Sequence, residues 1–490
     1  MPERDSPSSA ALHDYAGRLS LDLADPEAEA LAEQFAQQDT LLDSLDEVRP
    51  EGSPEREYWD PDTEADDLGA WLTRCDVERD TAGPLDGLTV GVKDNVAVAG
   101  VPMTCGSPLL TDPEYVPDRD ATVVERLLDA GARIVGKTNM DEFAFGGDRE
   151  NMRLRLGRNP HDPERQPGSS SVGSGIAAAT GEVDLAVGSD TGGSVRFPAA
   201  WCGVPGIKPT RGLVSHDGFV QFAKTLDNVG FLAPSVENLA LGLDAVAGPD
   251  PRDERTQGQE PDEYAAAVAE AAPEDIAIGL PDDLFGNAPD LDAVVRGAVG
   301  DLGDAGATVQ TVGIDNYDLW LPAWLGIGMT EVGNYLRANA VNVWALSPGQ
   351  SSLAERLHEE RTAGEAELGA PLQAAMLYAE HRNATDGNAA YSLAHEARRR
   401  LAAGVDAALA NVDVLASPTV PMLPPTWDDD LDDVFGALAN TGPFNVTGHP
   451  AVSVPCGTVD GLPVGLQFVA ERGADATALR AAASWMGLTD

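Results

Sequence analysis

The sequence predicts an α/β protein in which helices pack on a central β-sheet. An apolar run at 88–92 is followed by a helix-forming stretch at 121–130 and by a second apolar run at 133–135. The same strand, helix, strand order returns between residues 276 and 312. Because steps of this kind build βαβ units, we expect one sheet to span both halves of the chain.

The two ends of the chain differ in pattern. We expect a helical N-terminal arm and linker over residues 1–60, because a capped amphipathic helix pattern begins at Asp25 and residues 51–67 are rich in Pro, Gly, Asp and Glu. The main domain is expected over residues 61–490. Within it, residues 317–411 lack strand patterns and carry long helix-forming stretches, so we expect this mostly helical region to wall one side of a ligand cleft.

The composition is strongly acidic. Lys and Arg number 32 against 81 Asp and Glu, which gives a formal net charge of −49, while 43% of residues are hydrophobic and exclude an acidic disordered chain. Such a charge opposes sequence-independent attraction to nucleic acid or to an anionic membrane. Since carboxylates hold water and cations while salt screens their repulsion, we predict a halophilic, cytoplasmic protein without a nucleic-acid partner.

Cysteines and histidines form no pattern of metal ligands. Cys75, Cys105, Cys202 and Cys456 lie far apart without a C-x-x-C pair, and the seven histidines show no H-E-x-x-H spacing. No segment approaches the roughly 18 apolar residues of a membrane span, and the N-terminus lacks the apolar region of a signal peptide. We therefore expect free buried thiols, no metal, no cofactor and no membrane partner.

The segment 168–210 concentrates glycine, serine and alanine. Residues 176–179 are typical of a short packed helix, and 185–187 of a buried strand that leads into Gly188–Ser194. Small residues let the backbone approach a ligand and leave N–H groups pointing at it. A flexible linker would not bury the helix and the strand, so we expect a functional site built largely from main chain.

Several ordered motifs resemble those of the amidase-signature hydrolases. They are Val92–Asn95, the Ser-rich turn Gly168–Ser174, Gly188–Pro198, Cys202–Thr210, Phe444–Pro450 and Gly461–Gln467. The resemblance covers the chain from about residue 60 to its end. It implies the amidase-signature fold, with a mixed central β-sheet flanked by helices on both faces, and the hydrolysis of amides. Residues 61–490 are then expected to be the catalytic domain, with 317–411 on its substrate side.

Amide hydrolysis requires an activated nucleophile, an oxyanion hole and a proton for the leaving nitrogen. Ser194 is the candidate nucleophile, and the successive N–H groups of Thr191, Gly192, Gly193 and Ser194 can form an anion-binding nest. A Gly-rich turn with an ordinary capping serine is the alternative. Asp190 and Arg196 are expected to brace the loops rather than to act in the chemistry, and Ser171 is expected to support the site.

The base for Ser194 is not predicted to be a histidine. No histidine lies in a matching local motif, and neither serine cluster reads G-x-S-x-G. The resemblance implies instead that Lys93 is the base and that Ser170 relays the proton between Lys93 and Ser194. This relay is expected to involve an uncommon cis peptide bond. Lys93 must then be held neutral by burial. Ser169 or Ser171 stays open as the relay, because the turn departs from the family's usual glycines at two positions.

The predicted activity is hydrolysis of a small-molecule carboxylic amide to the acid and ammonia through an acyl-serine, by a chain that could form a homodimer. Gly100–Met103 and residues 181–186 resemble stand-alone bacterial amidases. The alternative is the glutaminase (A) subunit of the tRNA-dependent amidotransferase, which Gly136–Ala144 also resembles. The stretch after Gln350 lacks the basic Lys-Arg-Arg-Ile pattern associated with that subunit's glutamine pocket. A catalytically inactive binding protein is disfavoured because all three members of the implied catalytic triad, Lys93, Ser170 and Ser194, are present.

Overall fold

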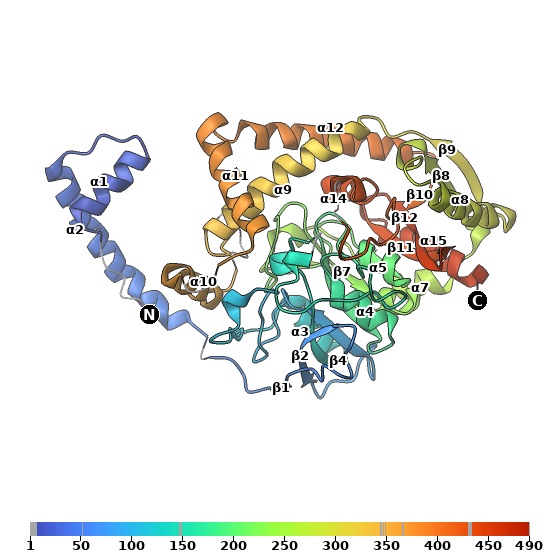
Figure 1. The fold of residues 1–490 in the computed structure, drawn as a ribbon, viewed down its shortest axis with the longest axis horizontal. Coiled ribbons are helices and arrows are strands. Elements are labelled where there is room, and N and C mark those ends of the chain that lie inside the picture. The colour runs from blue at the N-terminus through green and yellow to red at the C-terminus, as the bar shows by residue number, and fades with distance from the viewer. Residues whose placement is uncertain are drawn as a thin grey trace. The chain divides into compact units, whose positions relative to one another are not determined.

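The structure is a computed structural model of the 490-residue chain (Figure 1). It describes residues 7–50, 52–146, 149–343, 345, 347, 349–364, 367–429 and 434–489. Contacts divide the chain into two units, Met1–Ser53 and Pro54–Asp490, which are described separately.

The first unit consists of helices α1 (Ser9–Arg18) and α2 (Asp25–Leu42). Ser8 caps α1 by accepting a hydrogen bond from a backbone N–H at 3.2 Å, and Glu27 does the same at the start of α2 at 3.0 Å. Such caps satisfy amide groups that have no partner within the helix.

The second unit begins at Pro54, whereas the sequence predicts the boundary at residue 60. Residues Glu57–Trp59 form strand β1, which pairs with β2 (Trp71–Val77). Arg56 forms an ion pair with Asp120 at 2.6 Å. The charged residues that resemble a linker in the sequence are therefore part of the sheet's edge.

A mixed sheet runs through the second unit, and in the described residues it has twelve strands in the order β1-β2-β4-β3-β5-β7-β6-β11-β12-β10-β8-β9. The remaining strands are β3 (Thr89–Lys93), β4 (Arg133–Thr138), β5 (Leu185–Asp190), β6 (Gly206–Lys208), β7 (Asn228–Leu232), β8 (Ala277–Pro281), β9 (Thr308–Val312), β10 (Val414–Pro418), β11 (Ala451–Val459) and β12 (Leu462–Ala470). β3 is parallel to β4 and β5, and β8 is parallel to β9 and β10, whereas the other pairs are antiparallel. The prediction of a mixed sheet across both halves is confirmed.

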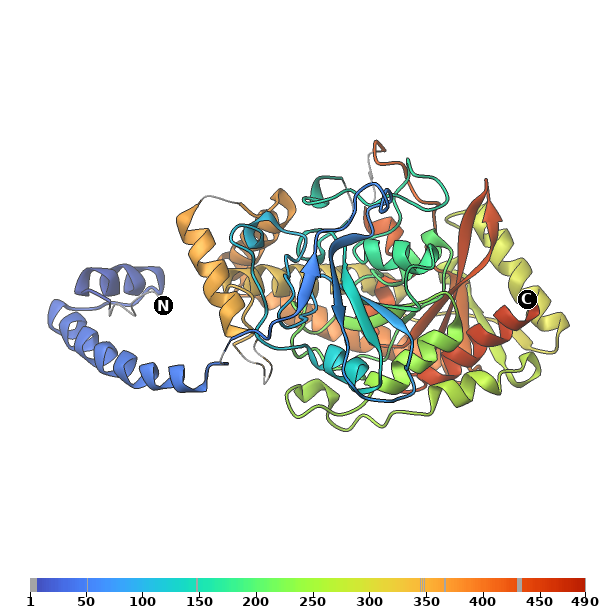
Figure 2. The same ribbon diagram turned by 90° about the horizontal axis from the view of Figure 1, so that it is seen from below.

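Helices cover both faces of this sheet (Figures 1 and 2). They are α3 (Thr122–Asp129), α4 (Val172–Ala179), α5 (Arg196–Cys202), α6 (Val236–Val246), α7 (Tyr264–Ala269), α8 (Pro289–Asp304), α9 (Trp320–Arg337), α10 (Ser351–Ala363), α11 (Ala370–Asp386), α12 (Ala389–Leu409), α13 (Val434–Ala437), α14 (Gly442–Thr447) and α15 (Asp475–Thr489). α3, α6, α7 and α15 pack in one layer, while α4 packs on α5. None of the helices in the described ranges is long and apolar enough to cross a membrane.

The helical region is held together by close packing of α9 against α11 and α12. A Cβ added at Gly333 would lie 2.4 Å from the carbonyl oxygen of Ala375, and one at Gly326 would lie 2.7 Å from the Cβ of Ala394. Only glycine allows the helices to approach this closely. This packing fixes α9, which carries two residues of the site described below.

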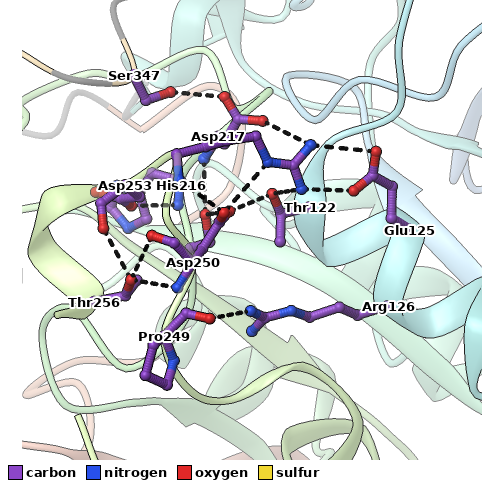
Figure 3. Close-up of polar contacts among 12 residues, drawn as sticks. Thr122, Glu125, Arg126, His216, Asp217, Pro249, Asp250, Asp253, Thr256 and Ser347 are labelled. Carbon is purple, nitrogen blue, oxygen red and sulfur yellow. Dashed lines mark hydrogen bonds and ion pairs between the residues drawn. The ribbon is translucent and has the colours of Figure 1, made fainter. Parts of the chain in front are cut away.

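A partly buried ionic network fixes the loop that precedes β7 (Figure 3). Arg252 forms ion pairs with Glu125 at 2.6 Å, Asp250 at 3.3 Å and Asp217 at 3.5 Å. Asp217 also accepts a hydrogen bond from Ser347 Oγ at 2.9 Å. The network thereby joins α3, the loop around residue 217 and the helical region.

Candidate active site

Lys93 lies at the carboxyl end of β3 and is fully buried. Its Nζ is 2.7 Å from Ser170 Oγ and 2.8 Å from Ser189 Oγ. Since β5 runs parallel to β3, Ser189 near the end of β5 reaches the same edge of the sheet. Ser189 was not among the site residues predicted from the sequence, although its position at the end of a predicted neighbouring strand is a usable signal.

The protonation of Lys93 follows from this burial. Desolvation by burial lowers the pKa of Lys93 to about 7. The negative charges of Asp141, Asp190 and Asp227 have the opposite effect and raise this pKa, but by less. A lysine with this pKa is largely neutral at slightly alkaline pH, and a neutral amine can accept a proton.

The Ser-rich turn presents its three serines in three different ways. The peptide bond between Ser169 and Ser170 is cis. Ser169 Oγ donates to Asp141 Oδ2 at 3.2 Å, and Ser171 Oγ donates to the carbonyl oxygen of Ser189 at 3.1 Å. Of the three, Ser170 is thus the serine whose hydroxyl meets Lys93, which favours it as the relay.

Ser194 lies in the turn before α5 and is partly exposed. Its carbonyl oxygen accepts a hydrogen bond from the N–H of Ser171 at 3.2 Å, so the nucleophile loop and the Ser-rich turn lie side by side. The structure therefore brings Lys93, Ser170 and Ser194 into one region, while the hydroxyl contact between Ser170 and Ser194 stays a prediction.

The predicted oxyanion loop is anchored by its carbonyl groups. The oxygen of Thr191 accepts from Trp324 Nε1 (3.0 Å), that of Gly192 from Thr441 Oγ1 (2.5 Å) and that of Gly193 from Phe197 N (2.7 Å). In a planar trans peptide the following N–H points to the opposite side. The amide groups of Gly192, Gly193 and Ser194 therefore point away from these anchors. The loop also requires glycine at position 193, where φ is 144° and an added Cβ would lie 2.6 Å from Thr441 Oγ1.

Asp190 and Arg196 form a buried ion pair at 2.9 Å behind this loop. Burial alone would raise the pKa of Asp190, but the charge and hydrogen bonds of Arg196 lower it to about 2. Arg196 also donates to Asn445 Oδ1 at 2.7 Å and to Gln467 Oε1 at 2.8 Å. These contacts tie the nucleophile turn to the C-terminal segments, which favours the predicted bracing role.

A cavity of about 160 Å³ opens in front of Ser194. Ser169, Thr191 and Gly192 line it on the side of the nucleophile. Most of the other lining residues are apolar, among them Phe145, Phe197, Phe222, Trp324, Met329 and Leu438. In the part of the chain that the structure describes, no charged side chain lines this cavity.

The Amidase family model matches residues 65–479. The chain belongs to the amidase-signature family. The predicted family and fold are thus confirmed, and the protein is an enzyme of this hydrolase family.

Two curated amidase-signature relatives and two solved structures show how far the likeness extends. The A subunit of glutamyl-tRNA(Gln) amidotransferase from Halobacterium salinarum is 42% identical over 424 residues, which is 85% of this chain and 99% of that protein. Its counterpart in Natronomonas pharaonis is 44% identical over 84% of this chain and 98% of its own. The structure of the Thermotoga maritima counterpart has a TM-score of 0.69 and 31% identity over 82% of this chain and 83% of that chain. 6-Aminohexanoate cyclic dimer hydrolase has a TM-score of 0.72 and 28% identity over 83% and 86%.

The comparisons correct the predicted partners. The sequence predicts a small-molecule amide, no nucleic acid and a possible homodimer. That prediction is wrong in leaving out nucleic acid and other subunits, because the relatives above are subunits of an amidotransferase named for glutamyl-tRNA(Gln). The prediction failed because net charge reports on unspecific attraction to nucleic acid and not on assembly into a larger enzyme.

Proposed function

We propose that the protein hydrolyses a carboxamide to the acid and ammonia through an acyl-Ser194 intermediate. The observation that carries this is the buried Lys93, whose Nζ lies 2.7 Å from Ser170 Oγ beside a cavity that Ser194 lines. A fully buried lysine held between two serine hydroxyls suits a neutral base better than a structural charge.

The steps follow from the positions of these groups. Neutral Lys93 accepts the Ser170 proton as Ser170 accepts the Ser194 proton, and Ser194 Oγ attacks the amide carbon. The N–H groups of residues 191–194 stabilise the negative charge on the oxygen. The proton returns through Ser170 to the leaving nitrogen, which departs as ammonia. Water then repeats the sequence on the acyl-serine and releases the acid.

The relatives support a role as the amide-hydrolysing A subunit of an amidotransferase, with glutamine as the ammonia donor. The chain spans 98–99% of the length of the two curated relatives given above, so it contains counterparts for nearly all of their residues. This role is the alternative that the sequence predicted, and the comparisons favour it over the predicted first choice.

The cavity supports a second candidate, an amide with an uncharged, apolar acyl group. Free glutamine carries an ammonium and a carboxylate, and burying such charges without partners costs several kcal/mol. The described lining offers aromatic and aliphatic side chains and no charged group. Glutamine bound there would need its charges to be met by residues outside that lining.

Ammonia release separates the two candidates. The purified chain, in about 3 M KCl to screen its charge, is assayed with glutamine, hexanamide and benzamide, alone and with the other subunits of an amidotransferase. Glutamine turnover that requires the other subunits supports the first candidate. Preferred turnover of the apolar amides supports the second. Ammonia release that is equal in the Ser194→Ala variant would overturn the proposal as a whole.

A further inference from the structure

We propose that Trp324 and Asp227 are positioning residues that couple the filling of the acyl pocket to the geometry of the oxyanion loop. The inference rests on the proposed function, because it assigns these residues to hydrolysis at Ser194. It concerns neither residue as an acid or base. Both act through Thr191, the first residue of the loop.

Asp227 joins the oxyanion loop to a wall of the pocket. It is fully buried immediately before β7. One carboxylate oxygen accepts from Thr191 Oγ1 at 2.5 Å, and the other accepts from the N–H groups of Phe222 at 2.8 Å and Ala223 at 3.0 Å. A single carboxylate thus holds both the loop and the residue whose ring lines the cavity.

Trp324 makes the same connection from the helical region. Its side chain is on α9 and only 7% of the residue is exposed. Nε1 donates to the carbonyl oxygen of Thr191 at 3.0 Å, and the indole stacks on Phe222 with ring centroids 6.4 Å apart and an interplanar angle of 27°. Both rings line the cavity. Thr191, Asp227, Phe222 and Trp324 therefore form a closed ring of contacts.

Through this ring of contacts, packing at the pocket wall can change the geometry of the oxyanion loop. The carbonyl that Trp324 holds belongs to the same peptide plane as the N–H of Gly192, a predicted oxyanion donor. An acyl group that packs on Trp324 and Phe222 fixes that plane, whereas a short acyl group leaves the wall without a packing partner. A larger acyl group should then stabilise the tetrahedral state more than the ground state, and so raise kcat rather than only lower KM.

Boronic acids report on this coupling without turnover. Ser194 Oγ forms a bond to the boron atom, its proton passes through Ser170 to Lys93, and the boron becomes a tetrahedral anion that resembles the intermediate. Methylboronic and phenylboronic acid differ in the group placed in the pocket. Acetamide and benzamide, bound to the Ser194→Ala variant, give the matching comparison for the ground state.

The variants separate the hydrogen bond from the packing. Trp324→Phe keeps a ring and removes the N–H, and Asp227→Asn keeps the shape and removes the charge. Met329→Leu is the matched control, because Met329 lines the same cavity from the same helix and donates no hydrogen bond. Each amide is measured with the same substitution added to Ser194→Ala, by calorimetry in about 3 M KCl.

Trp324→Phe and Asp227→Asn should each weaken phenylboronic acid binding by about tenfold, while benzamide binding changes by less than about threefold. Met329→Leu should change both ligands by the same factor. Equal losses for boronic acid and amide in Trp324→Phe or in a folded Asp227→Asn variant would overturn the inference and leave the proposed function intact. Boronic acid binding that does not depend on Ser194 in the parent protein would overturn both.

Discussion

The two sides of the cavity are built differently. The side that we propose to be catalytic is built on the ends of β3 and β5, and its polar groups are joined by hydrogen bonds, as in the buried Asp190–Arg196 pair. The side that we propose to hold the acyl group comes from α5, α9 and loops, and it consists of rings and aliphatic side chains that are held by packing. Under the proposed function, we expect polar networks, which tolerate little change, to fix the reaction geometry, and side-chain shape, which can change at lower cost, to set the choice of substrate.

The largest effect is expected on the catalytic side, from the triad. Ser194→Ala and Lys93→Ala should each lower kcat by a factor on the order of 10⁴ or more, because the members of such a unit act together. Ser170→Ala should be severe but milder, since water can replace a relay. The double variant Lys93→Ala with Ser194→Ala should be no worse than Ser194→Ala alone. Ser169→Ala is the control. A loss of activity there as large as in Ser170→Ala would show that the relay has been assigned to the wrong serine.

The next largest effect is on stability, from the buried ion pair of the same side. Arg196→Met leaves the Asp190 carboxylate buried without its partner, so unfolding in denaturant should become easier by about 3–5 kcal/mol. Arg133→Met removes a pair that is half exposed, Arg133–Asp76 at 2.6 Å, and should cost about 1 kcal/mol or less. Similar losses of stability in the two variants would contradict the distinction between the buried Asp190–Arg196 pair and the half-exposed Arg133–Asp76 pair.

On the acyl side we expect a change of preference with little loss of chemistry. Phe222→Leu shortens a ring that lines the cavity, so kcat/KM for benzamide relative to hexanamide should fall by about tenfold. The melting temperature should change little compared with that of Arg196→Met. An unchanged ratio of the two amides would mean that Phe222 does not contact the acyl group.

The smallest effect per residue is expected for the dependence of stability on salt, because that effect is spread over charges on the whole surface. With a formal net charge of −49, repulsion should destabilise the fold when screening is weak. The Debye length shortens from about 10 Å at 0.1 M to about 3 Å at 1 M salt. Thermal unfolding followed at increasing KCl should show a rising melting temperature. A flat curve between about 0.1 and 3 M would contradict the halophilic interpretation.

The position in the fold of the proposed catalytic residues could be predicted from the sequence, because contiguous motifs and strand ends carry them. Lys93, Ser170 and Ser194 lie on such motifs, and parallel strands bring their ends to one edge of the sheet. The acyl side could not. The hydrogen bond from Trp324 to Thr191 joins residues 133 positions apart, and helical periodicity predicts only that Trp324 is buried.

Asp227 illustrates the same limit at shorter range. Its contact with Thr191 spans 36 residues and depends on the pairing of β5 with β7. That pairing follows from the order of strands in the sheet, which no local pattern specifies. The structure divides the chain after Ser53 rather than near residue 60, because β1 is short and is stabilised by its partner β2, which no local pattern specifies.

The central claim, that neutral Lys93 is the base, is tested most directly by the dependence of kcat/KM on pH. Burial lowers the pKa of Lys93 to about 7, so the base is protonated and inactive below that pH and becomes active as the pH rises through it. Burial also raises the pKa of Asp227 to about 7, and the Asp227→Asn variant removes that second group. We predict that kcat/KM rises with pH and levels off above about 7 in the parent. The rise should persist in Asp227→Asn but level off at a lower pH, because the charge of Asp227 raises the pKa of Lys93. A profile that is flat from about pH 5 to 9 in the parent, or a rise that disappears in Asp227→Asn, would contradict the claim.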